Sequence, residues 1–194
     1  MKNISVYISQ LLGDQGIIKQ EDIDTCRYGI DFFIASVLEI SSVLVIALLV
    51  GNFIETLLYF TAFIPLRIYA GGYHADTQLR CYIILLGVYG LFTALINCIP
   101  VDAYVFIEIV SILFTALMVW AFAPIVNDKK SINDSEKAFY RKFSITIMLI
   151  EFTTVIVSIC FTQGNRYILS FSLGQLAVST SMVAAFVKTK LQGR

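Results

Sequence analysis

The sequence has few charged residues. Asp, Glu, Lys and Arg make up 14% of the 194 residues, whereas 58% are apolar, and the mean hydropathy is +0.80. This composition excludes a soluble domain of ordinary make-up. The formal net charge is zero, so any affinity for charged partners must depend on where the charges lie. We expect no nucleic-acid partner, no metal ion and no other cofactor.

We expect no signal peptide at the N-terminus, because residues 1–31 are polar and charged and have no apolar stretch near their start. Five apolar residues there share one helical face: Ile4, Tyr7, Ile8, Leu11 and Leu12. The pattern predicts a short amphipathic helix that lies on the membrane surface. Docking of this helix on the protein's own cytoplasmic face is the alternative, and the sequence does not separate the two.

Apolar runs long enough to cross a bilayer occur at residues 32–50, 53–69, 81–99, 104–122, 143–161 and 167–187. They predict an all-α, polytopic membrane bundle of about six transmembrane helices plus the N-terminal amphipathic helix. We expect one integral-membrane domain over 1–194. It would comprise a cytoplasmic segment at 1–31, the bundle at 32–187 and a cytoplasmic tail at 188–194.

The cations support this topology, since Lys and Arg accumulate on the cytoplasmic side of membrane spans. Six spans with both termini in the cytoplasm place the following cations inside: Lys2, Lys19, Arg27, Arg67, Arg80, Lys129, Lys130, Lys137, Arg141, Lys142, Lys188, Lys190 and Arg194. Only Arg166 then faces outward. We therefore expect a multi-pass protein of the cell membrane with both termini cytoplasmic.

A polar segment, residues 67–81, separates the second and third runs. It contains the only histidine, His74, and Cys81 follows seven residues later at the start of the next run. Each residue alone is more often a packing or interfacial group. Together with a glycine pair, a predicted helix start and the flanking Arg67 and Arg80, the pattern favours a catalytic base and nucleophile.

The spacing requires a break in the helix before the third span. Seven residues on one continuous helix span about 10.5 Å of rise, too far for an imidazole to reach a thiol. Pro65 falls in the final turn of the second run, and Gly71-Gly72 permits backbone angles closed to other residues. Asp76 or Thr77 can cap a new helix, with Cys81 near its first turn, where the helix dipole favours a thiolate.

Four glutamates lie inside apolar runs: Glu39, Glu55, Glu108 and Glu151. Because carboxylates are costly there, they raise the rival hypothesis of a small six-span transporter with a midplane binding site. Buried packing groups are the simpler interpretation. Cys98 and Cys160 lie near the outer ends of their spans. We expect both to be free packed thiols, and a disulfide between them is the alternative. Small-residue rows (Gly87, Gly90, Ala94; Ser170, Gly174, Ala177, Ser181, Ala185) suit packing inside the bundle or a homodimer.

The pattern Arg67-x3-Gly71-Gly72-x-His74-Ala75-x5-Cys81 resembles AgrB, the accessory gene regulator B family. The amphipathic N-terminus, Arg27-Tyr28-Gly29 and Ala123-Pro124 followed by Lys129-Lys130 extend the likeness over nearly the whole chain. The resemblance implies a membrane-embedded cysteine endopeptidase of Gram-positive quorum sensing. Its partners would be the lipid bilayer and an AgrD-like propeptide, which loses its C-terminal tail and is closed into a thiolactone or lactone.

Carried over by position, the resemblance makes His74 the general base and Cys81 the nucleophile. Arg67 and Gly72 fall on positions that support activity, and Lys129 and Lys130 match a basic region that would bind the propeptide. The amides at the start of the Cys81 helix, with Gln78 or Arg67, are the candidate oxyanion donors. A homodimer is compatible with a bundle this small.

Overall fold

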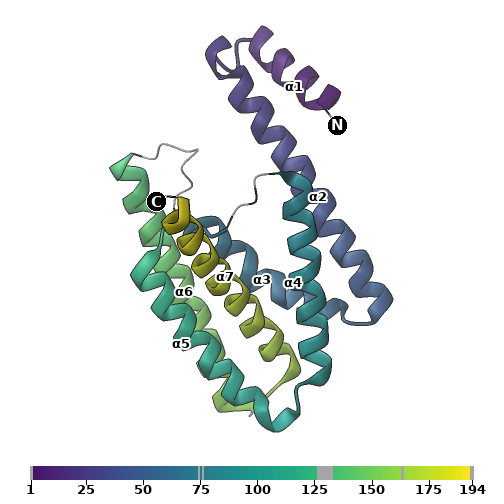
Figure 1. Ribbon diagram of the computed structural model, residues 1–194, viewed down its shortest axis with the longest axis vertical. Helices are drawn as coiled ribbons and strands as arrows, with labels where there is room; N and C mark the ends of the chain where they lie inside the picture. Colours follow the sequence, from purple (N-terminus) through teal and green to yellow (C-terminus); the bar gives the residue numbers. More distant parts are fainter. Residues whose placement is uncertain (1, 74, 76, 126–132, 163, 193–194) are drawn as a thin grey trace. The chain divides into compact units, whose positions relative to one another are not determined.

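The computed structural model describes residues 2–73, 75, 77–125, 133–162 and 164–192. These residues form seven α-helices: α1 (Lys2–Asp14), α2 (Ile23–Val50), α3 (Phe53–Ala70), α4 (Gln78–Cys98), α5 (Tyr104–Phe122), α6 (Asp134–Thr162) and α7 (Arg166–Gln192). Short 3-10 turns, Gln20–Asp22 and Val101–Ala103, precede α2 and α5. Six helices are long and apolar enough to cross a membrane. The predicted all-α polytopic fold is therefore confirmed (Figure 1).

The chain divides into two compact units, Met1–Ile46 and Ala47–Arg194. In the first unit, α1 buries the small residues Ser5 and Ser9, and Gly13 lies against the side chain of Ile23 at the start of α2. Its apolar residues Ile4 and Tyr7 are exposed. Leu11 of the predicted apolar face is exposed as well, whereas Ile8 and Leu12 are half-buried within this unit. The exposed part of this face suits a membrane surface.

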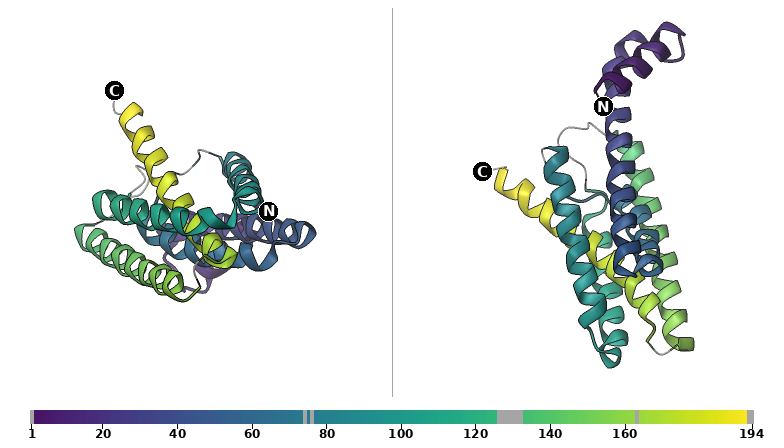
Figure 2. Two further views of the ribbon diagram at one scale, coloured as in Figure 1. Left: turned by 90° about the horizontal axis from the view of Figure 1, so that it is seen from below. Right: turned by 90° about the vertical axis from the view of Figure 1, so that its right-hand side faces the viewer.

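The second unit is a bundle in which α3, α5 and α7 run in one direction. Arg166, which begins α7, hydrogen-bonds Glu55 near the start of α3, and Arg67 near the end of α3 hydrogen-bonds Ser181. The turn before α7 lies beside the start of α5, where a Cβ added to Gly164 would be 3.5 Å from the Cβ of Tyr104. Because α4 and α6 connect these helices, they run the opposite way (Figures 1 and 2).

α7 is the most buried of the six long helices. It packs against both α3 and α5. A Cβ on Gly174 would overlap the backbone oxygen of Tyr59, so only glycine permits this approach of α3 and α7. The small-residue row of α7 therefore serves packing inside the bundle. In contrast, a Cβ on Gly87 or Gly90 of α4 would meet no described atom within 4 Å.

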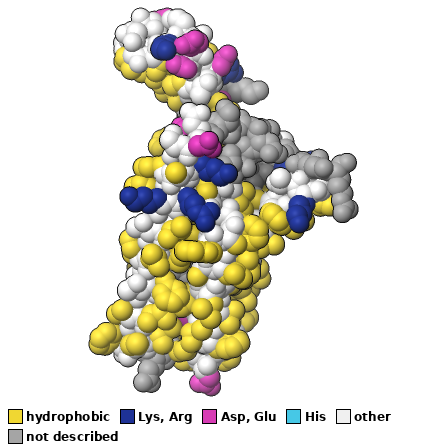
Figure 3. All heavy atoms as spheres, turned by 90° about the vertical axis from the view of Figure 1, so that its left-hand side faces the viewer, with side chains coloured by type: hydrophobic (Ala, Val, Ile, Leu, Met, Phe, Trp, Pro, Cys, Tyr) yellow, Lys and Arg dark blue, Asp and Glu magenta, His cyan; other side chains and the backbone are white. Residues whose placement is uncertain are grey.

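Helix ends differ from the apolar runs because hydropathy marks the stretch suited to lipid, not the whole helix. α2 begins at Ile23 and α6 at Asp134, each nine residues before the predicted run. α3 continues through Pro65 to Ala70, so the proline does not lie in the last turn. Figure 3 shows a face of hydrophobic side chains with Lys and Arg gathered toward one end of the bundle.

Candidate active site

The chain breaks from helix between α3 and α4, as the spacing of residues 67–81 predicted. α3 ends at Ala70, and α4 begins at Gln78. Thr77 is the N-cap, since its side-chain hydroxyl accepts a hydrogen bond from the backbone N–H of Arg80 at 3.3 Å. The predicted break and cap are confirmed, and we call the described residues that follow α3, Gly71 to Tyr73, the turn.

Gly71 starts this turn with φ of 81°, in the region that favours glycine. The segment after α5 lies against it: the N–H of Ile125 donates to the carbonyl of Ala70 at 2.9 Å, and Gly71 and Ile125 form an isolated β-bridge. A Cβ on Gly71 would overlap the backbone oxygen of Ile125. The turn is therefore joined to the segment that follows α5.

Gly72 is buried and has φ of 143°. A Cβ at this position would overlap the guanidinium of Arg67 and lie 2.6 Å from the hydroxyl oxygen of Ser181. Both the backbone conformation and the space around it thus require glycine. This gives a physical reason for the predicted importance of Gly72.

The guanidinium of Arg67 holds the turn by hydrogen bonds. Its Nη1 donates to the carbonyl of Gly71 at 3.0 Å and to Ser181 Oγ at 2.8 Å, and its Nη2 donates to the carbonyl of Tyr73. These donors hold both sides of Gly72. Arg67 is therefore committed to the backbone of the turn that leads to His74.

Ser181 of α7 contacts this turn, and sequence reasoning did not include it among the site residues. Its hydroxyl accepts from Arg67, and its hydroxyl and carbonyl oxygens both lie 3.0 Å from the backbone nitrogen of Tyr73. The sequence placed Ser181 only in a row of small packing residues. Nothing local distinguishes a serine that packs from one that holds a remote arginine.

Cys81 lies in the first turn of α4 and is half-buried. Its backbone N–H donates to the carbonyl of Thr77 at 3.1 Å, and its thiol lies within range of an electrostatic interaction with the guanidinium of Arg67. A helix start and a nearby cation both favour the thiolate form of cysteine. Cys81 thus lies near the turn that Arg67 holds. Gln78, at the start of α4, is exposed.

Three predicted site residues, His74, Lys129 and Lys130, lie outside the described residues. The neighbouring Tyr73 and Ala75 are half-buried. The ammonium group of Lys188 lies 5.2 Å from the centre of the Tyr73 ring, a cation–π contact from α7. Arg141 of α6 donates to the carbonyls of Ala123 and Trp120 at the end of α5.

The other candidate groups lie elsewhere. Glu55 forms an ion pair of 2.8 Å with Arg166, and Glu108 and Glu151 are buried inside the bundle. All four cysteines are free, and Cys98 and Cys160 are exposed rather than packed. Among the described residues no three His, Cys, Asp or Glu side chains form a group that could hold a metal.

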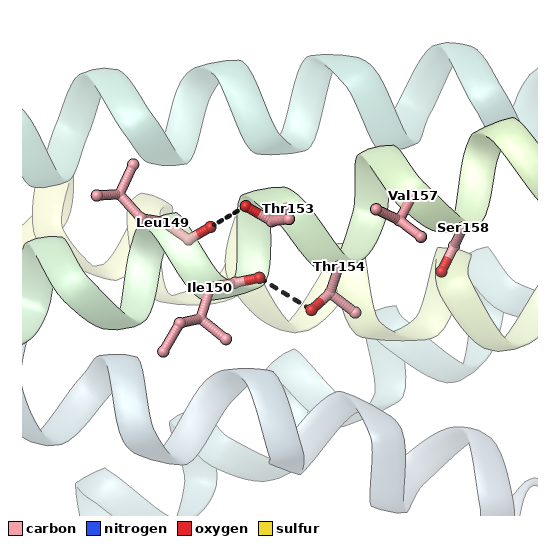
Figure 4. Close-up of a pocket in the computed structure, with 6 residues that line it drawn as sticks. All are labelled: Leu149, Ile150, Thr153, Thr154, Val157 and Ser158. Atoms are coloured by element: carbon pink, nitrogen blue, oxygen red, sulfur yellow. Dashed lines mark hydrogen bonds between the residues drawn. The ribbon is translucent and has the colours of Figure 1, made fainter.

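A shallow depression on α6 offers no chemistry for catalysis. Its lining comes from one helix: Leu149, Ile150, Thr153, Thr154, Val157 and Ser158 (Figure 4). The hydroxyls of Thr153 and Thr154 donate to the carbonyls of Leu149 and Ile150, at 2.8 and 2.9 Å. With these groups satisfied, the depression is a mainly apolar part of a membrane-spanning surface.

The fold and the turn define a multi-pass membrane protein with a cysteine at a helix start beside an arginine-held glycine turn. Comparison with known proteins supports a more specific statement. The model of the family Accessory gene regulator B matches residues 2–183, and the chain belongs to this family. Membership associates it with accessory gene regulator quorum sensing and with the peptidase activity of that family.

Two similar proteins come from Clostridium perfringens. An AgrB-like protein of strain SM101 is 29% identical over 95% of this chain and 85% of its own length. AgrB-like protein 2 of strain 13 is 30% identical over 88% of this chain and 82% of its own length. No solved structure matches the chain significantly.

Proposed function

We propose that this protein is a membrane-embedded cysteine endopeptidase that removes the C-terminal tail of an AgrD-like propeptide and promotes closure of a thiolactone or lactone. The observation that carries the proposal is the position of Cys81. It occupies the first turn of α4, in electrostatic range of the Arg67 that holds the turn before His74. The family match supports the same reaction class.

In the proposed reaction His74 takes the proton of Cys81, and the thiolate attacks the carbonyl carbon of the scissile peptide bond. The C–N bond breaks, and the imidazolium protonates the departing amine. The core of the propeptide is then held as a thioester on Cys81. A cysteine thiol or serine hydroxyl of the propeptide gives its proton to the neutral His74 and attacks this thioester, which closes the ring, breaks the bond to Cys81 and releases the Cys81 thiolate.

The positions of the surrounding groups indicate which role each of them has in this reaction. Arg67 uses its donors on Gly71, Tyr73 and Ser181, so we assign it a positioning role instead of oxyanion binding. The N–H groups of Gln78 and Leu79, in the first turn of α4, have no intrahelical acceptor by the rules of helix geometry. They are our candidates for stabilising the oxyanion.

We further propose that the whole chain is one peptidase domain with both termini in the cytoplasm. The turn and the linker between α5 and α6 would then meet the propeptide at the inner membrane surface. Lys129 and Lys130 of that linker would attract an acidic propeptide tail. Reversing both charges, Lys129→Glu with Lys130→Glu, should weaken propeptide binding at low salt.

The proposal is tested with the full-length protein in liposomes and a synthetic AgrD-like propeptide. Cys81→Ala and His74→Ala should insert normally and release no C-terminal tail, as measured by mass spectrometry. Cys26→Ala is the matched control, because it removes a half-buried cysteine from another helix, and it should retain cleavage. Trapping with hydroxylamine should convert the acyl-enzyme of the wild type into a peptide hydroxamate.

Cleavage by either variant would overturn the assignment of the catalytic pair. The transporter hypothesis drew on Glu39, Glu55, Glu108 and Glu151. Glu55 is paired with Arg166 near the start of α7, and Glu39 belongs to the first unit. The pairing with Arg166 therefore removes Glu55 from the carboxyl groups that could serve as unpaired binding groups for a transported ligand.

A further inference from the structure

Polar side chains line the facing sides of α5 and α7 deep in the bundle. Thr115 Oγ1 and Ser179 Oγ lie 2.6 Å apart in a hydrogen bond that fixes the register of the two helices. We call the following group the polar ladder: Glu108, Ser111 and Thr115 of α5, and Ser172, Gln175 and Ser179 of α7. All six are buried, with at most 2% of any of them exposed.

Because α5 and α7 run in the same direction, the residues of the polar ladder lie opposite one another in three pairs, and we call each pair a level. Steps of four and seven residues return to the same face of a helix. From the Thr115–Ser179 bond, four residues back on each helix are Ser111 and Gln175. Seven residues back are Glu108 and Ser172. These side chains therefore occupy two adjacent levels of the interface.

Oxygens at these two levels are unpaired. Within the described part of the chain, no hydrogen-bond partner exists for either carboxyl oxygen of Glu108, for Oγ of Ser111 or Ser172, or for Oε1 of Gln175. Each such group costs free energy when it is removed from water without a partner. Five orphaned oxygens at one helix interface are therefore expected to share a ligand.

We propose that Glu108, Ser111, Ser172 and Gln175 form a binding site for a small monovalent cation of the sodium type. All donors are oxygens, which suit hard cations. The carboxylate of Glu108 with one monovalent cation gives a neutral pair, which suits a membrane interior. Glu151 of α6, which is buried beside Gln175, adds no charge to this pair when it is protonated. A proton would satisfy one of the five oxygens, but a cation can contact all of them.

The site is separate from the proposed peptidase site. A core of buried apolar residues follows the ladder toward the ends of α5 and α7, and it includes Val119, Val178 and Met182. Val119 and Met182 lie beyond the Thr115–Ser179 bond, on the side of the turn held by Arg67 and Ser181, whereas the four proposed ligands precede that bond in both helices. The cation would therefore stabilise the packing of α5 on α7 and would take no part in the chemistry of Cys81.

The test is thermal unfolding of the purified full-length protein at constant pH and ionic strength, with sodium chloride replaced stepwise by choline chloride. Sodium should raise the melting temperature in a saturable manner, because a ligand that binds only the folded state stabilises it. Glu108→Gln should abolish the sodium-dependent rise. Ser111→Ala should shift the midpoint of the sodium titration to higher concentration.

Glu39→Gln is the matched control, since it neutralises a carboxyl group on α2 outside the ladder, and it should keep the full sodium response. Each variant is first shown to be monodisperse, and its melting curve in choline gives its own baseline. An identical melting temperature in sodium and choline for the wild type would overturn the proposal. A sodium response that persists in Glu108→Gln, or stabilisation by acid alone, would overturn it as well.

Discussion

Arg67 and Ser181 stand 114 positions apart in the sequence, yet Nη1 of the arginine donates a 2.8 Å hydrogen bond to the serine hydroxyl. This contact joins the end of α3 to α7 at the level of the turn that leads to His74. The same hydroxyl accepts from the backbone N–H of Tyr73. One serine thus fixes both the arginine and the turn that the arginine holds.

Ser181→Ala should slow propeptide cleavage about ten- to hundredfold, because hydrogen bonds to charged groups contribute about 1.5–3 kcal/mol. The fall should appear in kcat, with KM for the propeptide little changed, since the serine positions the turn without contacting substrate. Ser181→Thr keeps the hydroxyl and should restore most of the rate. Thr180→Ala removes a neighbouring exposed hydroxyl bonded within its own helix and serves as the control; an equal loss there would contradict the positioning role.

Gly72→Ala should abolish cleavage and lower the melting temperature. The added Cβ would overlap the guanidinium of Arg67, and φ of 143° is strained for alanine. Gly90→Ala adds the same methyl group where no described atom lies within 4 Å, and it should leave both properties near wild type. Activity assays in liposomes and melting curves measure the two effects. Full activity of Gly72→Ala would show that the turn is not rigid.

Glu55→Gln should reduce stability without changing cleavage per folded molecule. The carboxylate accepts from Arg166 at 2.8 Å, near the starts of α3 and α7 and far from Cys81. Loss of about 1 kcal/mol would lower the melting temperature by about 2–4 °C. A double-mutant cycle with Arg166→Gln measures the pair, and the two single losses should exceed the loss in the double variant. Additive losses would show that the pair contributes nothing.

Labelling of single-cysteine variants tests the proposed orientation. Cys98 is exposed at the end of α4, and Cys26 is half-buried near the start of α2. With both termini in the cytoplasm, a membrane-impermeant maleimide should modify Cys98 in intact cells and should reach Cys26 only after permeabilisation. The reverse pattern would place the Cys81 end of the bundle outside. Mass-tag gel shifts report the outcome.

The sequence predicted those features of the fold that depend on local composition. The six apolar helices, the break at Gly71-Gly72 and the Thr77 cap all follow from hydropathy, backbone freedom and capping chemistry near each residue. Helix ends were less accurate, because polar residues at the start of α2 and α6 are helical without being apolar. Hydropathy has no signal for a helix that continues out of the lipid.

Contacts between distant residues were beyond local patterns. The importance of Arg67 was expected from its place in the motif, but its acceptors, Ser181 above all, depend on how α3 packs along α7. The approach of Ile125 to Gly71 likewise depends on where the fold places the segment that follows α5. The polar ladder is a similar case, since its serines and glutamine look unremarkable until two parallel helices align them.

The arginine contacts at both ends of the α3–α7 pair also limit how these two helices can move. Arg166 fastens the starts of the two helices and Arg67 fastens their ends, so any sliding of one along the other must break both attachments. α4 is secured differently: its buried residues are Tyr89, Phe92 and Ile96, all in its second half. A peptide that reaches Cys81 would therefore meet the less buried half of α4, while α3 and α7 act as a fixed frame.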